Sequence, residues 1–308
     1  MIIKKKYLIS IVGPTSVGKT NLSIYLAKKF NTEIISCDSR QFYKELNIGT
    51  SKPSKKILKK IKHHFINNLN IYKNYNIYLF EKEVIKKLNK LFNKYNLIIM
   101  VGGSCLYEKT IIKGISILPK INKKKLYNLR KKLNNKNIKK LIKKIKKEDY
   151  LFFKKLKNKK DKRKIIRALE IKLITKKKFS YLKKKNKIKK RPFDKYLRIG
   201  LILKKKQIYE NINYNVNLMI KNGLLNEAKN LFKKKNINLN SLNTIGYKEI
   251  FNCFLKKKNF FNAINNIKNN TKKYVKKQLI WYKKMKDIKW FKPNQKNKIL
   301  NYIKNKIK

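Results

Sequence analysis

The segment GPTSVGKT at residues 13–20 constrains the fold of this chain more than any other feature. An apolar run typical of a buried strand precedes it, and apolar residues recur at helical spacing after it, from Leu22 to Phe30. In such a strand, loop and helix, glycines let successive backbone N–H groups point at phosphate oxygens at the positive end of the helix dipole. Lys19 adds a positive charge and Thr20 a hydroxyl for Mg²⁺. We therefore predict a phosphate-binding loop; the alternative is a tight turn that binds no ligand. The loop consists of Gly13, Pro14, Thr15, Ser16, Val17, Gly18, Lys19 and Thr20.

Further apolar runs predict an α/β fold around a P-loop-type parallel sheet with flanking helices. The runs at residues 33–37, 97–101 and 196–203 are typical of strands. After Pro119 the chain becomes rich in Lys, with apolar residues at helical spacing. We predict that residues 1–119 form the first part of the core, 120–160 a small helical insertion, and 161–308 the completion of the core with the C-terminal helices.

Polar or small residues follow two of these predicted strands. Asp38 comes directly after residues 33–37, and doubly wound sheets bind ligands beyond the carboxyl ends of their strands. Its carboxylate can ligate Mg²⁺, act as a general base or cap a helix. Gly102 and Gly103 end the strand predicted at residues 97–101, where a glycine pair permits either close approach of a ligand or tight packing of the backbone.

The chain is strongly basic, with 85 Lys and Arg against 15 Asp and Glu and a net charge of +70. Such a charge attracts nucleic acid without sequence preference. An abundance of Asn and Ile is also expected of drift toward AT-rich codons, so the Lys excess has two interpretations. No apolar run reaches the roughly 18 residues of a membrane span, and Cys37, Cys105 and Cys253 form no C-x-x-C pair. We expect a cytoplasmic protein without membrane contact.

Eight segments resemble, in this order, the tRNA dimethylallyltransferases of bacteria, the tRNA isopentenyltransferase family. They are GPTSVGKT, DSRQFYKELNIGTSKP, HHFIN, VGGSCLY, RKIIRALE, NLMIKNGLLNEA, IGYKEI and KKYVKKQLIWYKK, and the resemblance covers most of the chain from residue 8 to about 291. The resemblance implies transfer of a dimethylallyl group from dimethylallyl diphosphate to the exocyclic amine of the adenine just 3′ of the tRNA anticodon. It also implies a monomer whose helical insertion grips the anticodon stem.

The resemblance assigns roles to residues of this sequence. The loop would hold the diphosphate, with Lys19, Thr20 and Mg²⁺ stabilising the leaving group. Asp38 would take a proton from the adenine amine and share the metal with Thr20, and the target base would be extruded to reach it. Gln41 would bond a base edge. The residues implied in tRNA binding are Asp38, Ser39, Arg40, Gln41, Ser104, Arg163, Lys164, Ile165, Ile166 and Arg167.

The chain also departs from the family pattern. Asn215 stands where the family usually carries an Arg implicated in handling the diphosphate, and Asn supplies neither a charge nor a bidentate fork. Asn67 replaces a usual Asp, and Lys272, Lys273 and Lys277 replace arginines. Three alternatives to the family activity remain: a P-loop kinase, an isopentenyltransferase acting on free adenine nucleotides, and a non-catalytic tRNA-binding protein.

Overall fold

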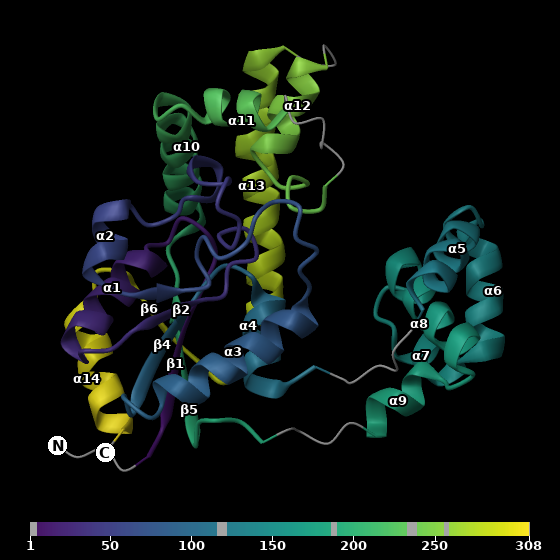
Figure 1. Ribbon diagram of the computed structural model, residues 1–308, viewed down its shortest axis with the longest axis horizontal. Helices are drawn as coiled ribbons and strands as arrows, with labels where there is room; N and C mark the ends of the chain where they lie inside the picture. The colour runs from purple at the N-terminus through teal and green to yellow at the C-terminus, as the bar shows by residue number, and fades with distance from the viewer. Residues whose placement is uncertain (1–4, 116–121, 186–189, 233–238, 256–258, 308) are drawn as a thin grey trace. The chain divides into compact units, whose positions relative to one another are not determined.

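A computed structural model describes residues 5–115, 122–185, 190–232, 239–255 and 259–307. The chain divides into two compact units (Figure 1). The first unit is Met1–Ile112 together with Arg191–Lys308, and the second is Lys113–Lys190. The second unit is therefore an insertion between two parts of the first.

The first unit is built on one parallel sheet with strand order β3-β2-β4-β1-β5-β6. The central strand β1 is buried along its whole length, which explains its almost purely apolar sequence. Ile9 of β1 pairs with Ile99 of β4 on one side and Leu197 of β5 on the other. The parallel α/β fold predicted from the sequence is confirmed. The strands are β1 (Tyr7–Val12), β2 (Ile34–Ser36), β3 (His63–His64), β4 (Leu97–Val101), β5 (Lys195–Leu201) and β6 (Ile288–Phe291).

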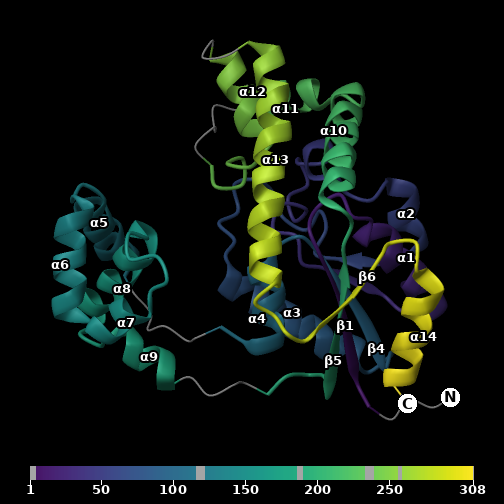
Figure 2. The ribbon, with the colours of Figure 1, turned by 180° about the vertical axis from the view of Figure 1, so that it is seen from behind.

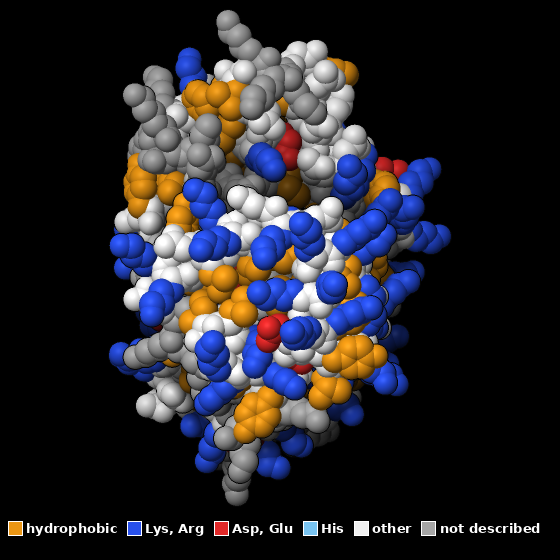
Figure 3. All heavy atoms as spheres, turned by 90° about the vertical axis from the view of Figure 1, so that its right-hand side faces the viewer, with side chains coloured by type: hydrophobic (Ala, Val, Ile, Leu, Met, Phe, Trp, Pro, Cys, Tyr) orange, Lys and Arg blue, Asp and Glu red, His pale blue; other side chains and the backbone are white. Residues whose placement is uncertain are grey.

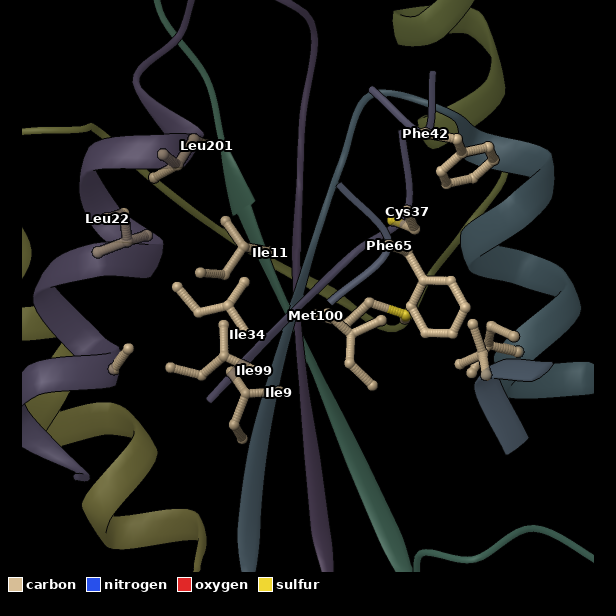
Figure 4. Packing of buried hydrophobic residues seen from close by; sticks show 14 of the residues in the cluster. Ile9, Ile11, Leu22, Ile34, Cys37, Phe42, Phe65, Ile99, Met100 and Leu201 are labelled. Atoms are coloured by element: carbon tan, nitrogen blue, oxygen red, sulfur yellow. The ribbon is translucent and has the colours of Figure 1, made fainter. Parts of the chain in front are cut away.

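Helices cover both faces of the sheet. Successive residues of each strand point to opposite sides, so apolar side chains lie on both faces and both faces need a covering layer. Ile9 and Ile99 lie on the side of α1, with Leu22, whereas Met100 lies on the other side with Phe65 (Figure 4). The helices α1 (Lys19–Lys29) and α14 (Lys296–Lys306) contact each other, and α3 (Ile77–Leu91) and α4 (Cys105–Lys113) lie across the sheet from them (Figure 1).

The remaining helices of the first unit gather near the carboxyl ends of the strands. Helices α10 and α13 pack against each other, and α13 also packs against α12 (Figure 2). This arrangement encloses the edge of the sheet where the predicted phosphate loop follows β1. The elements are η1 (Ile48–Thr50), α2 (Lys55–Lys60), α10 (Lys205–Lys221), α11 (Leu224–Phe232), α12 (Tyr247–Phe254) and α13 (Phe260–Tyr282).

A buried charge network fixes α4 against the sheet. Nε of Arg198, on β5, donates to Oε1 of Glu108, on α4, at 2.7 Å, and both side chains are almost completely buried. Ser10 donates to the same carboxylate at 3.0 Å, and Asp287 binds the other end of the guanidinium. Burial raises the pKa of Glu108, and the Arg198 charge opposes that rise. The network holds α4 directly after the Gly102–Gly103 turn.

The second unit has its own hydrophobic core. Leu141 and Ile145 of α6 pack with Ile165 and Leu169 of α8, while lysines occupy the outer face of α6. The unit therefore continues past the predicted end at residue 160, because α8 buries its apolar face there rather than in the sheet. Its helices are α5 (Lys123–Asn134), α6 (Ile138–Glu148), α7 (Tyr150–Lys155), α8 (Lys162–Thr175) and α9 (Phe179–Lys185).

Lys and Arg side chains dominate the surface seen in Figure 3, with few acidic side chains between them. Over the described part of the chain, no helix combines the length and the apolar character needed to span a membrane.

Candidate functional site: a phosphate loop and a carboxylate in one pocket

The loop between β1 and α1 has the backbone geometry that its glycines predict. Gly13 has φ 138°, and a Cβ placed on it would lie 2.4 Å from the carbonyl oxygen of Leu201. Gly18, with φ 86°, immediately precedes α1. A side chain at Gly13 is excluded both by this close approach and by the positive φ. The loop therefore ends at the amino terminus of α1, as a phosphate-binding loop does.

Lys19 is folded back against this loop. Its Nζ donates to the carbonyl oxygen of Pro14 at 2.6 Å. Burial lowers the pKa of Lys19 to about 8, although the nearby Asp38 carboxylate raises it. Lys19 is half-buried at the pocket wall, and an anionic partner there favours its charged form.

A pocket of about 670 Å³ opens beside the loop and is lined by residues of the first unit. Three residues of the loop, Gly13, Pro14 and Val17, are buried and do not line the pocket. The predicted residues that it brings together are Thr15, Ser16, Gly18, Lys19, Thr20, Asp38, Ser39, Arg40, Gln41 and Ser104.

Asp38 follows β2 and faces the end of β4. Its Oδ1 accepts from the backbone N–H of Arg40 at 3.0 Å, so it stabilises a turn and does not cap a helix. Ser104 accepts from the backbone N–H of Ser39 at 3.0 Å and donates to its hydroxyl at 3.1 Å. These bonds tie the segment after Asp38 to the segment after Gly103.

Comparison with known proteins agrees with this geometry. The IPP transferase family model matches residues 41–285. The tRNA dimethylallyltransferase of Christiangramia forsetii is 45% identical over 302 residues and covers 98% of both chains. The chain belongs to the IPP transferase family. The tRNA dimethylallyltransferase of Flavobacterium psychrophilum is 40% identical over 308 residues, with 98% of this chain and 99% of the relative covered.

Solved structures of this family have the same fold. The tRNA isopentenylpyrophosphate transferase of Bacillus halodurans has a TM-score of 0.73 at 28% identity, with 98% of this chain and 97% of that chain covered. A eukaryotic dimethylallyltransferase acting on tRNA has a TM-score of 0.80 at 29% identity, with 94% and 74% covered. The family resemblance inferred from the eight segments is confirmed.

In this IPP transferase, the side chains of Arg40 and Gln41 line the pocket and fix neighbouring backbone segments by hydrogen bonds. Arg40 donates to the backbone carbonyls of Asn240 at 2.7 Å and Asn243 at 3.3 Å. Gln41 donates to the carbonyl of Thr50 at 3.2 Å. Both side chains were predicted to contact tRNA, and here both bind backbone of the first unit.

Glu227 positions another wall that sequence reasoning missed. Its carboxylate accepts from the backbone N–H groups of Asn47, Ile48 and Gly49 at 3.0–3.3 Å and from the Tyr247 hydroxyl at 2.6 Å. Glu227 lies in the segment NLMIKNGLLNEA, but nothing in the spacing of that segment indicates a partner so distant in the chain. The carboxylate fixes the segment that brings Gly49, Thr50 and Ser51 into the pocket.

The predicted tRNA-binding residues of α8 lie in the second unit of this transferase. Arg163 and Lys164 are exposed, and Arg167 forms an ion pair with Glu170 at 3.1 Å. Ile165 and Ile166 are buried in the core of that unit, at 0% and 5% exposure. The prediction is wrong for these two side chains, because they form the apolar face of α8.

Among the described residues, no group of three or more His, Cys, Asp or Glu side chains could hold a metal ion. Mg²⁺ in phosphate-binding sites commonly takes one or two protein ligands, with water and substrate phosphate completing its shell. Thr20 and Asp38 line the same pocket and supply such a limited donor set. The residues of this transferase fit a Mg²⁺ ion that arrives with a diphosphate.

Proposed function

We propose that this IPP transferase moves a dimethylallyl group from dimethylallyl diphosphate to the exocyclic amine of the adenine 3′ of a tRNA anticodon. The observation that carries the proposal is the joining of a phosphate loop and Asp38 in one pocket. Relatives covering nearly the whole chain are named tRNA dimethylallyltransferases. The pocket volume lies in the range of small-molecule sites, and the anticodon base enters by leaving its stack.

In the proposed reaction, the loop binds the diphosphate group of the donor and stabilises it as it leaves. Backbone N–H groups at the start of α1 and the Lys19 ammonium stabilise the negative charge that develops as the carbon–oxygen bond breaks. Mg²⁺, held by Thr20 and Asp38, would neutralise further charge on the departing diphosphate. The leaving group is inorganic diphosphate.

The acceptor end belongs to Asp38. The lone pair of an adenine amine is delocalised into the ring, so nitrogen attacks carbon more readily when its proton is removed. The Asp38 carboxylate, oriented by the Arg40 N–H, accepts that proton as the carbon–nitrogen bond forms. Atoms balance, because the amine loses one proton and gains one dimethylallyl group.

We assign tRNA recognition to the basic second unit as well as to the pocket. Exposed lysines of α6 offer phosphate contacts without sequence preference. A monomeric cytoplasmic enzyme is part of the proposal. The comparisons give no support to a kinase or to an enzyme that acts on free adenine nucleotides. Lys19, Thr20 and Asp38 line one pocket, which favours an enzyme over a non-catalytic tRNA-binding protein.

Nucleoside mass spectrometry tests the proposal. Unmodified tRNA with adenine 3′ of its anticodon is incubated with the protein, Mg²⁺ and dimethylallyl diphosphate. We expect N6-isopentenyladenosine at that position, and none when diphosphate donor or protein is omitted. AMP in place of tRNA is the matched acceptor control. Absence of product despite tRNA binding would overturn the proposal in favour of the non-catalytic alternative.

The affinity for dimethylallyl diphosphate is expected to fall as pH rises through about 8, the pKa of Lys19. Its pKa is lowered from the ordinary value, so Lys19 is charged below pH 8 and neutral above it, and the anion binds the charged form. Above that pH, KM should rise by up to about tenfold per pH unit. KM measured from pH 7 to 9.5 checks this.

Lys19→Arg is the control for that pH dependence. Arg stays charged to above roughly pH 12, so the KM of this variant, whatever its starting value, should not bend near pH 8. A bend of equal size in the variant would assign the ionisation to another group.

Asn215→Arg is expected to tighten diphosphate binding. The Asn215 side chain donates to the Ser16 hydroxyl at 3.0 Å, so it lies against the phosphate loop. A charged donor contributes about 1 kcal/mol more than a neutral one, which predicts a KM for dimethylallyl diphosphate lower by about fivefold. Asn215→Gln, which lengthens the side chain without adding charge, should not lower KM. Equal KM values for both variants would contradict the prediction.

A further inference from the structure

Gln278, on α13, joins two loops of the pocket through one side-chain amide. It is 1% exposed. Its Oε1 accepts from the backbone N–H of Thr15 at 3.0 Å, and its Nε2 donates to the carbonyl oxygen of Gly103 at 2.7 Å. A backbone N–H only donates and a carbonyl only accepts, so these partners decide which end of the amide is oxygen.

The Gly103 end of this bridge lies beside Asp38. A Cβ placed on Gly103 would be 3.2 Å from Nε2 of Gln278 and 3.4 Å from Oδ2 of Asp38. The Tyr274 hydroxyl, one helical turn before Gln278, also donates to the Gly103 carbonyl, at 3.0 Å. Two donors from α13 therefore fix the turn that faces the carboxylate.

The Thr15 end lies in the phosphate loop. The Thr15 backbone N–H donates to Gln278, so this N–H positions the loop and is not free to bind phosphate. The sequence-based prediction was that every residue of the loop contributes to diphosphate binding. The Ser39 N–H bonds Ser104, the residue after Gly103. A continuous path of hydrogen-bonded groups thus runs from the loop through Gln278 to the segment that follows Asp38.

We propose that Gln278 is a positioning residue that couples the position of the diphosphate loop to that of Asp38. The inference rests on the proposed function. The attacking nitrogen and the leaving diphosphate must lie in line with the reacting carbon, so the relative placement of loop and carboxylate controls the rate. A displacement of about 1 Å can cost about 100-fold. Gln278 touches the two loops and acts through them.

Gln278→Met tests the kinetic part, because Met has similar length and removes both bonds. We expect kcat to fall about 10- to 100-fold, with the KM values for both substrates changed by less than about threefold. Tyr274→Phe is the matched control: it removes one bond to Gly103 and leaves the link to Thr15, so kcat should fall less than about fivefold. Unchanged kcat per folded Gln278→Met molecule, or equal losses in both variants, would overturn the coupling.

Amide hydrogen exchange tests the coupling without turnover, using inorganic diphosphate and Mg²⁺ as the probe. In the wild-type protein, saturation with diphosphate should slow exchange at Ser39, and Thr15 should be protected even without diphosphate. Gln278→Met should lose the response at Ser39 and the protection at Thr15. If diphosphate slows exchange at Ser39 equally in the wild type and in Gln278→Met, the inference is overturned. If the wild type shows this response but transfers no dimethylallyl group to tRNA, only the assigned reaction is overturned.

Discussion

Asp38→Asn is expected to lower kcat for prenyl transfer by at least about 100-fold, the lower end of what general-base catalysis contributes. Asn keeps the oxygen that accepts from the Arg40 N–H, so the turn should survive. It lacks the charge needed to take the proton from the adenine amine. Single-turnover kinetics with saturating tRNA and dimethylallyl diphosphate measure the chemical step directly.

Two controls separate loss of chemistry from loss of the pocket. tRNA binding by Asp38→Asn should remain within about threefold of wild type, since one carboxylate contributes little to a largely electrostatic association. Ser39→Ala, which removes the neighbouring hydroxyl but no ionisable group, should retain most of kcat. A rate for Asp38→Asn within tenfold of wild type would assign proton removal to another group or to water.

Glu108→Ala is expected to destabilise the first unit by about 3–5 kcal/mol, because it leaves the buried Arg198 guanidinium without its main partner. Both tryptophans of the chain, Trp281 and Trp290, belong to the first unit, so their fluorescence reports the unfolding of that unit in urea. The expected result is a lower midpoint with an unchanged slope.

The double variant Glu108→Leu with Arg198→Met distinguishes the uncompensated charge from lost packing. Replacing a buried ion pair by apolar side chains of similar volume is often neutral or stabilising. The double variant should therefore be more stable than Glu108→Ala. A double variant as unstable as the single one would show that packing around α4, rather than charge, determines the loss.

Features governed by local pattern could be predicted from the sequence. The loop at residues 13–20 follows from glycines, Lys19 and Thr20 between a strand and a helix. The proximity of Asp38 to this loop follows from parallel strands, whose carboxyl ends meet at one edge of the sheet. Both predictions depended on residues close together in the chain or on a simple rule of sheet topology.

The residues that shape the pocket could not be predicted in this way. Glu227 binds backbone N–H groups of residues 47–49, and Gln278 binds backbone of Thr15 and Gly103. Any residue type presents the same backbone N–H and carbonyl, so the partners leave no trace in the sequence. The boundary after residue 160 failed for a related reason: the apolar stripe of α8 suits either core, and only packing on α6 selects one.

The position of the insertion sets an order of events during synthesis. The central strand β1 pairs with β4, made before the helical unit, and with β5, made after it. At a translation rate of about 5–20 residues per second, one edge of β1 stays unpaired for several seconds until β5 is synthesised. The helical unit is contiguous in the chain, so it can form its own hydrophobic core during this time. An unpaired edge strand invites association with another chain. Mutual repulsion between nascent chains of this strongly positive protein, +70 in full, opposes that association.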